Sequence, residues 1–223
     1  MAETGWPLIP RELLPAPVPV ARRKRPAEPR PASRQRQLPI FGAETTDASP
    51  LDVVGLLAGP GRLERMGGTA RVSVPVDSAW RVHVLAAELV SRGLVVNWKP
   101  LESGGFEVRT AYSSRLNDLA RTWPAAADKL FFNGARIRLW VAAAGAPHDD
   151  GYAFGLTGDD EPLEVIDTAL RRAGLDGAVF DDVSDQGRCY LITGRQRLRR
   201  LAELVGERPA SAPDPVWPGA AAA

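Results

Sequence analysis

The chain has 223 residues, of which 44% are apolar and 25% are charged, a balance typical of one globular domain with tails or of two small domains. The single cysteine, Cys189, excludes an internal disulfide. Since the whole chain has only two histidines, no metal site is expected. The formal net charge is +1, and no uncharged apolar run approaches the roughly 20 residues that a membrane helix needs. With no secretory signal at the start either, we expect a cytoplasmic protein without a membrane partner.

The two ends of the chain differ in composition from its middle. Residues 1–45 carry eight basic side chains against four acidic ones, and the basic ones include the run Arg22, Arg23, Lys24 and Arg25. Because a proline-rich, charged stretch buries too little apolar surface to offset its ordering entropy, residues 1–37 are predicted to be a disordered arm. Residues 209–223, with four prolines and a run of alanines, are predicted to be a disordered tail for the same reason.

Residues 38–128 contain signals for a first run of helices and strands. Ser49 followed by Pro50 is typical of a helix start, and Gly67-Gly68 is typical of a two-residue hairpin turn. The expected elements are, in order, a helix over about 50–59, strands at 62–66 and 69–76, a helix over 79–92, strands at 95–101 and 106–112, and a helix that begins at Ser114.

Residues 129–208 repeat this order. A helix over about 135–144 is followed by a hairpin that turns near Asp150-Gly151, a helix over 162–172, strands at 178–183 and 188–193, and a helix over 195–205. The sequences themselves match in register, since Ser-Arg-Gly-Leu at 91–94 corresponds to Arg-Ala-Gly-Leu at 172–175. The sequence therefore predicts an α+β fold, a duplicated αββαββα unit with pseudo-symmetry and a curved antiparallel sheet.

Each half opens with an apolar helix of small residues that ends at glycine, at 53–61 and at 137–145. This duplicated pattern, over roughly residues 50–206, resembles the LAGLIDADG homing endonucleases and the non-cleaving LAGLIDADG domain of the sporulation regulator WhiA. The resemblance implies that the two opening helices pack against each other at the pseudo-dyad. The small residues expected to meet there are Gly55, Ala58 and Gly59 from the first helix and Ala142, Ala143 and Gly145 from the second.

The motif departs from that family at its chemistry. Catalytic members carry a carboxylate immediately before each terminal glycine, and the two acids hold divalent metal for phosphodiester hydrolysis. Here those positions are Pro60 and Ala144, and neither side chain offers an oxygen ligand. The nearby acids Glu64, Asp149 and Asp150 belong to the hairpins. The departure predicts a protein that has no metal or other cofactor and is not an enzyme.

In that family the sheet faces the DNA duplex, so the outward side chains matter. Strand alternation places Leu63, Val72, Val74, Val96, Trp98, Phe106 and Val108 beneath the helices. The side chains that then point outward in the first half are Arg62, Glu64, Arg71, Ser73, Asn97, Lys99, Glu107 and Arg109. This mostly basic and amide-bearing face suits phosphates and base edges. The alternative is an ordinary solvated sheet face, where arginine and lysine are also common.

The second half does not match the first in charge. Its expected outward positions are small, acidic or apolar: Ala153, Gly155, Thr157, Asp181, Cys189 and Leu191. From Ala146 onward there are eight basic residues and fourteen acidic ones. Either DNA contacts the first half alone, or the second face is a surface for a protein partner, which exposed Cys189 and Leu191 would favour.

The N-terminal arm has several interpretations. Its run of basic residues at 22–25 can raise duplex affinity by counterion release, it can serve only as a solubilising tail, or its prolines at 15–19 can dock a partner as polyproline II. The leading hypothesis is a non-catalytic protein that binds double-stranded DNA in a regulatory or architectural role and associates with the nucleoid. The alternative is a protein-interaction module that does not bind nucleic acid.

Overall fold

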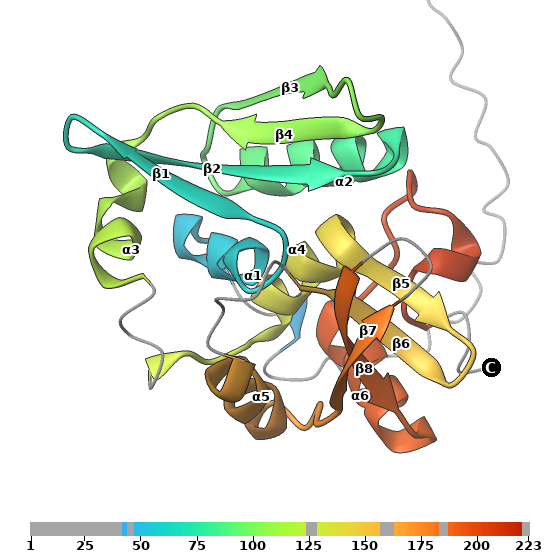
Figure 1. Ribbon diagram of the computed structural model, residues 1–223. Helices are drawn as coiled ribbons and strands as arrows, with labels where there is room; N and C mark the ends of the chain where they lie inside the picture. The colour runs from blue at the N-terminus through green and yellow to red at the C-terminus, as the bar shows by residue number, and fades with distance from the viewer. Residues whose placement is uncertain (1–41, 44–46, 124–128, 157–162, 183–186, 220–223) are drawn as a thin grey trace, which may run out of the picture. The chain divides into compact units, whose positions relative to one another are not determined.

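The computed structural model describes residues 42–43, 47–123, 129–156, 163–182 and 187–219, which all belong to one contact unit of residues 37–223 (Figure 1). The predicted arm at 1–37, with its basic run at 22–25, and the outward position Thr157 lie outside the described residues. Within the described ranges, no helix has the length and apolar character needed to cross a membrane.

The first half forms one four-stranded antiparallel sheet with helices on one face. Its strands lie in the order β1-β2-β4-β3. The elements are η3 (Pro50–Val53), α1 (Val54–Leu57), β1 (Arg62–Met66), β2 (Thr69–Val76), α2 (Ala79–Ser91), β3 (Val96–Pro100), β4 (Phe106–Thr110), η4 (Ser114–Leu116) and α3 (Asn117–Thr122).

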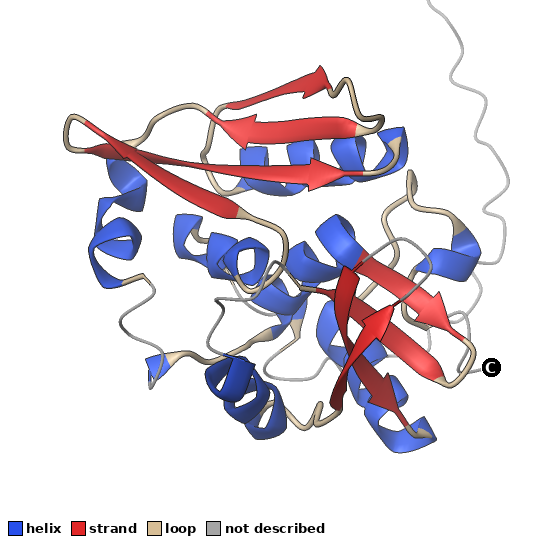
Figure 2. Ribbon diagram, viewed as in Figure 1, coloured by secondary structure: helices blue, strands red, loops and turns tan. Residues whose placement is uncertain are grey.

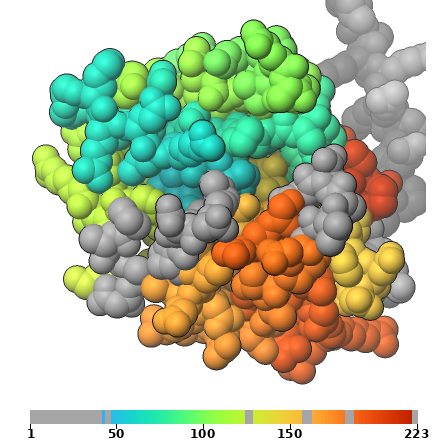
Figure 3. Space-filling view, in the orientation of Figure 1, coloured from blue at the N-terminus to red at the C-terminus, as the bar shows by residue number. Residues whose placement is uncertain are grey.

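The second half repeats this arrangement, with strands in the order β5-β6-β8-β7. Its elements are α4 (Gly134–Ala144), β5 (Gly145–His148), β6 (Gly151–Gly155), α5 (Leu163–Arg172), β7 (Ala178–Asp182), β8 (Gly187–Thr193), α6 (Arg195–Val205) and η6 (Asp214–Val216). The duplicated α+β order predicted from the sequence is confirmed, and the strands form two separate sheets, one in each half (Figure 2). In the space-filling view the two halves occupy separate parts of the visible surface (Figure 3).

Local sequence signals account for where these elements begin and turn. The Ser49 side chain accepts a hydrogen bond from the first turn while Asp52 accepts one from the Ser49 backbone, so the predicted helix start is a complete capping box. The expected helix is split into the 3-10 turn η3 and the short α1. Gly67 and Gly68 have φ values of 55° and 80°, which a two-residue hairpin turn requires and glycine allows.

The core of the protein lies around α4. This helix contacts α1, α2 and α6, and Figure 1 shows α1 and α4 side by side between the two sheets. Trp140 of α4 is fully buried, stacks on Phe154 with 4.8 Å between ring centroids, and donates a hydrogen bond from Nε1 to the Gly155 carbonyl at 3.0 Å. Because α4 is buried on nearly every side, its sequence has apolar residues all round and no amphipathic pattern.

The two opening helices approach each other most closely at Gly55. A Cβ at this position would overlap the backbone carbonyl of Arg136, near the start of α4. At the C-terminal ends of the two helices, the expected contact between Gly59 and Gly145 is not formed. Gly59 lies against the Trp140 indole, and Gly145 lies against Tyr152 and its own helix, because the large Trp140 side chain fills the space beside α1.

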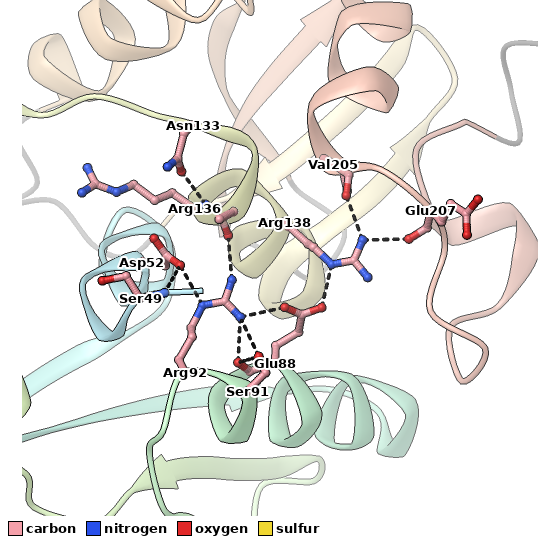
Figure 4. A network of polar contacts seen from close by, with 11 residues as sticks. Ser49, Asp52, Glu88, Ser91, Arg92, Asn133, Arg136, Arg138, Val205 and Glu207 are labelled. Carbon is pink, nitrogen blue, oxygen red and sulfur yellow. Dashed lines mark hydrogen bonds and ion pairs between the residues drawn. The ribbon is translucent and has the colours of Figure 1, made fainter. Parts of the chain in front are cut away.

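A chain of ion pairs joins the two halves beside this crossing (Figure 4). Buried Arg92 pairs with buried Asp52 at 3.0 Å and with Glu88 at 2.7 Å. The other oxygen of Glu88 pairs with Arg138 of α4 at 2.6 Å, and Arg138 also donates to the Val205 carbonyl at 2.8 Å. Burial would raise the pKa of Glu88, but the hydrogen bonds and charges of Arg138 and Arg92 outweigh it and lower that pKa.

The C-terminal segment corrects the sequence prediction. Residues 209–219 of the expected disordered tail are packed on the second half, and Trp217 is only 3% exposed. The Tyr152 hydroxyl donates to the Val216 carbonyl at 2.9 Å, and the Arg138 guanidinium lies 5.1 Å from the Trp217 ring centroid. The prediction of disorder gave weight to the four prolines and overlooked Trp217, whose side chain buries a large apolar surface. Residues 220–223 lie outside the described residues.

Candidate nucleic-acid interface

The first-sheet outer face is the side of β1–β4 that points away from the helices. The strand register brings four of the predicted residues into one row across all four strands, in the order Arg62, Ser73, Arg109 and Asn97. Arg71 lies two residues along β2 from this row, and Lys99 lies two residues along β3. Strand alternation therefore assembles these side chains on one surface, with Val72, Val74 and Val108 buried beneath it.

Acidic neighbours balance part of the positive charge on this face. Arg71 donates to Glu64 at 2.7 Å and lies 4.7 Å from the centre of the Tyr112 ring. The Lys99 ammonium lies 3.2 Å from Glu107, and the Arg109 guanidinium lies 3.9 Å from the same carboxylate oxygen. Four basic and two acidic side chains thus leave the first-sheet outer face positive, but less so than its basic residues alone suggest.

Two predicted orientations need correction. Ser73 is only 5% exposed, because it lies in a central strand between the long side chains of Arg62 and Arg109, so its hydroxyl is not freely presented. Trp98 was expected beneath the helices and does lie on that side, paired with Val108. Since β3 is an edge strand, the Trp98 side chain is nevertheless 56% exposed, with its ring edge-on to Phe106.

The ends of the two opening helices meet at a cavity of about 320 Å³. Pro60 and Ala144, the two positions at which the sequence comparison expected motif carboxylates, both line it, together with Asp77 and Arg81. The Arg81 side chain is buried, and it donates to the carbonyls of Val141 and Ala142 at 3.2 Å and of Gly145 at 2.8 Å. The Val141 and Ala142 carbonyls lie in the last turn of α4, and Gly145 is the C-cap, whose N–H also donates to the Val141 carbonyl. The guanidinium therefore adds hydrogen bonds at this helix end and balances the negative end of the helix dipole.

The residues at this position do not fit the divalent metal that the fold family implies. Among the described residues, Asp77 is the one carboxylate in the lining, and its Oδ1 already accepts a hydrogen bond from Arg81 Nε at 3.0 Å. Divalent metals of this chemistry require several oxygen ligands, and a guanidinium supplies none. Across the described parts of the chain, no group of three or more metal-binding side chains is found.

Sequence reasoning missed Arg81 and Arg92. Arg81 lies in α2 and Arg92 is the C-cap of that helix. The apolar stripe of α2 also differs from expectation, because Val90 is 60% exposed. One signal was present for Arg81, since Asp77 precedes it by four residues, the spacing of an ion pair on one helix face. A charged residue within an amphipathic helix gives no local sign that its carbonyl partners come from another half of the fold.

The outer face of the second sheet also differs from expectation. Cys189 is only 2% exposed and Ala153 only 7%, so neither presents the surface that the sequence suggested. The register places Phe180, rather than Asp181, beside Cys189. Asp181 lies on the opposite side of the strand, paired with Arg188. Buried Cys189 therefore gives no support to the expected surface for a protein partner.

Comparison with known proteins identifies the fold. No protein-family model matches the sequence, and no curated protein matches it. Among solved structures, the homing endonuclease I-WcaI bound to its DNA recognition sequence is 10% identical, with a TM-score of 0.51 over 74% of this chain and 84% of that one. Mesophilic variants of the homing endonuclease I-DmoI are 14% identical, with a TM-score of 0.49 over 70% of this chain and 94% of that one.

The N-terminal LAGLIDADG domain of DUF199/WhiA is 13% identical, with a TM-score of 0.49 over 70% of this chain and 81% of that one. At such low identity, the likeness to I-WcaI shows a shared fold. The LAGLIDADG-like fold predicted from the repeated glycine-terminated helices is confirmed by this likeness.

Proposed function

Proceeding from a LAGLIDADG-like fold, we propose that this protein binds double-stranded DNA through its first-sheet outer face and does not cleave it. The observation that carries the proposal is the row of Arg62, Ser73, Arg109 and Asn97 across four strands, flanked by Arg71 and Lys99. Arginine matches phosphate and guanine edges, and asparagine matches adenine edges. I-WcaI, which shares the fold, is a DNA-bound protein, and this supports the choice of ligand.

The paired carboxylates shape the kind of binding proposed. Glu64 and Glu107 hold Arg71, Lys99 and Arg109 in position, and they also reduce the attraction of the face for phosphate. Binding by this face alone therefore has a shallow salt dependence, since few counterions are released from the duplex. A regulatory or architectural role fits such a surface, and it would place the protein on the nucleoid.

The absence of cleavage is proposed from the helix ends. Pro60 and Ala144 stand where catalytic members of the family carry acids, and neither can hold a cation. Arg81 brings a fixed positive charge to the end of α4, which opposes the entry of a divalent metal. We expect supercoiled plasmid to remain uncut by the protein in the presence of Mg²⁺ or Mn²⁺, and the appearance of nicked or linear DNA would contradict this.

The decisive experiment is a fluorescence-anisotropy titration of a labelled duplex at moderate salt. The double variant Arg62→Glu with Arg109→Glu reverses two charges of the row, and we expect at least a tenfold loss of affinity. Arg121→Glu with Lys129→Glu is the matched control, because it reverses two exposed charges away from this face. The proposal fails if the wild type binds no more tightly than an unrelated protein, or if the two double variants lose affinity equally.

A protein-interaction module is the second candidate function. The outer face of the second sheet supports it through its apolar character, since Phe180 and Leu191 are partly exposed there. Leu191→Arg places a charge on that face and leaves the first sheet unchanged. If this variant loses a protein partner while wild-type protein shows no DNA binding, the second candidate replaces the first.

A further inference from the structure

A second cluster of positive charge lies far along the chain from the first sheet. An open groove of about 750 Å³ lies between the N-terminal half of α6 and the loop that joins α5 to β7. Four arginines and two acids supply its charged lining, namely Arg195, Arg197, Arg199, Arg200, Asp176 and Glu203. Among the described residues, the rest of the lining is Gly174, Gly194 and Gln196. The second half is acidic in total, so this concentration of arginine is local.

The arginines stand where helix electrostatics disfavours them. The first turn of α6 has no acidic residue and Gly194 provides no side-chain cap, while Arg195 and Arg197 lie at the positive end of the helix dipole. A positive charge at this end of a helix is destabilising. Arg195 and Arg199 are also four residues apart, and like charges at this spacing repel each other on one helix face. The neighbouring α5 follows the opposite rule, with Glu164 in its first turn and arginines in its last.

The two acids compensate only part of this charge. Both oxygens of Asp176 accept hydrogen bonds from Arg197, at 2.7 and 2.6 Å, and the bonds to Arg197 lower the pKa of Asp176. Glu203 lies 3.3 Å from Arg199 and 3.8 Å from Arg200. Arg195 makes no hydrogen bond or ion pair with the residues that the structure describes. An anion bound in the groove would relieve the remaining repulsion.

We propose that this groove, which we call the α6 arginine groove, is a binding site for phosphate groups. The planar guanidinium matches two phosphate oxygens at once, and the uncapped N–H groups of the first turn add to the attraction. The described lining consists of charged and polar side chains and glycines, so we expect recognition to rest mainly on charge. This favours the phosphodiester backbone of a nucleic acid over a free phosphorylated small molecule.

The proposal goes beyond the proposed function, because the α6 arginine groove shares no residue with the first-sheet outer face. A protein with both sites would hold nucleic-acid phosphates at two separate places. The α6 arginine groove is tested by the double variant Arg195→Glu with Arg199→Glu, which reverses as many charges as the double variant of the first-sheet outer face. Arg195→Glu places an acid in the first turn of α6, which favours the helix dipole, whereas Arg199→Glu removes the ion pair with Glu203 at 3.3 Å. These effects oppose each other, so we expect the variant to fold with a melting temperature close to that of the wild type.

The test uses the full chain and two probes. Anisotropy titrations of a labelled duplex at several salt concentrations measure the slope of log Kd against log salt, and the groove variant is expected to reduce this slope by roughly two. Inorganic phosphate at constant ionic strength is the second probe, and we expect it to raise the melting temperature of the wild type but not of the variant. Arg121→Glu with Lys129→Glu serves again as the control of equal charge change.

The outcomes separate the two sources of phosphate. A slope reduced in the groove variant and unchanged in the control supports a nucleic-acid backbone. A response to inorganic phosphate alone, lost in the variant, supports a free phosphorylated ligand. Loss of neither response overturns the proposal. Repeating the titration in protein that carries Arg62→Glu and Arg109→Glu measures groove binding by itself, so failure of the first-sheet interface is distinguished from failure of the groove.

Discussion

Gly55 of α1 lies so close to the backbone carbonyl of Arg136 that a methyl group at position 55 would overlap it. The two opening helices therefore pack at a distance that only glycine permits. Backbone cannot move aside as a flexible side chain can, so Gly55→Ala forces the helices apart. Overpacking of a core typically costs about 1–3 kcal/mol, and we expect at least this loss in free energy of unfolding, measured by urea denaturation.

Gly67→Asn is the comparison for this prediction. Gly67 also has a special role, with φ of 55°, but nothing lies within 4 Å of a Cβ there and asparagine tolerates this conformation. We expect its midpoint to stay close to the wild type. If Gly55→Ala unfolds at the wild-type midpoint, the close crossing is wrong.

Arg81→Met removes the guanidinium that satisfies the end of α4. The Val141 carbonyl keeps its hydrogen bond from the Gly145 N–H, whereas the Ala142 and Gly145 carbonyls lose the donor that Arg81 supplies. A buried carbonyl left without a donor costs about 1–3 kcal/mol, so a fall in melting temperature is expected. Arg121→Met, at a position whose side chain is 76% exposed, should leave the melting temperature unchanged. Because the site does not fit a divalent metal, Mg²⁺ should not restore the melting temperature of Arg81→Met. Restoration of Arg81→Met by Mg²⁺ would count against this account of the helix ends.

Glu88→Gln tests the ion pairs that join the halves. The pKa of Glu88 in the folded protein lies below its ordinary value of 4.5, so its carboxylate stabilises the fold above that pH, and this stability is lost as the pH falls through the folded pKa. The difference in unfolding free energy between wild type and Glu88→Gln is therefore expected to be largest at pH 7 and smaller below pH 4.5. A difference independent of pH would exclude an ionised Glu88 as its source.

Glu64→Gln separates attraction from repulsion on the first-sheet outer face. Glu64 holds Arg71 by a hydrogen bond that raises the pKa of Arg71, and it also repels phosphate. Removing the carboxylate frees Arg71, so we expect duplex affinity to rise several-fold in anisotropy titrations. Glu102→Gln, an exposed position outside the strands, should have no such effect. Weaker binding by Glu64→Gln would mean that DNA does not contact Arg71 on this face.

Trp217→Ala tests whether the C-terminal segment belongs to the fold. Replacing a buried tryptophan by alanine costs about 3–5 kcal/mol, and we expect a loss of that size in calorimetry or urea denaturation. Trp98→Ala removes an equally large side chain that is 56% exposed, and it should cost far less. Equal losses in the two variants would show that residues 209–219 contribute little to stability.

Local patterns made the element order readable before the structure. Helix caps such as Ser49, glycine turns such as Gly67-Gly68 and the strict alternation of β2 act within a few residues, so the chain carries them visibly. The row that contains Arg62 and Arg109 could also be predicted from the sequence, because alternation and turn position together determine the register of a hairpin. The charges that balance this row depend on side-chain conformations that no periodicity reports.

The amino-acid sequence by itself determined the duplicated order of helices and strands, and it placed Pro60 and Ala144 at the ends of the two opening helices. Only the tertiary structure decided what fills the space beside them. Arg81 reaches carbonyls some sixty positions away, Trp140 displaces the expected contact of Gly59, and Trp217 returns to cover the second half. These contacts depend on the way distant segments are brought together, and burial of a charged or aromatic side chain is set by the neighbours that folding supplies rather than by the residues beside it in the chain.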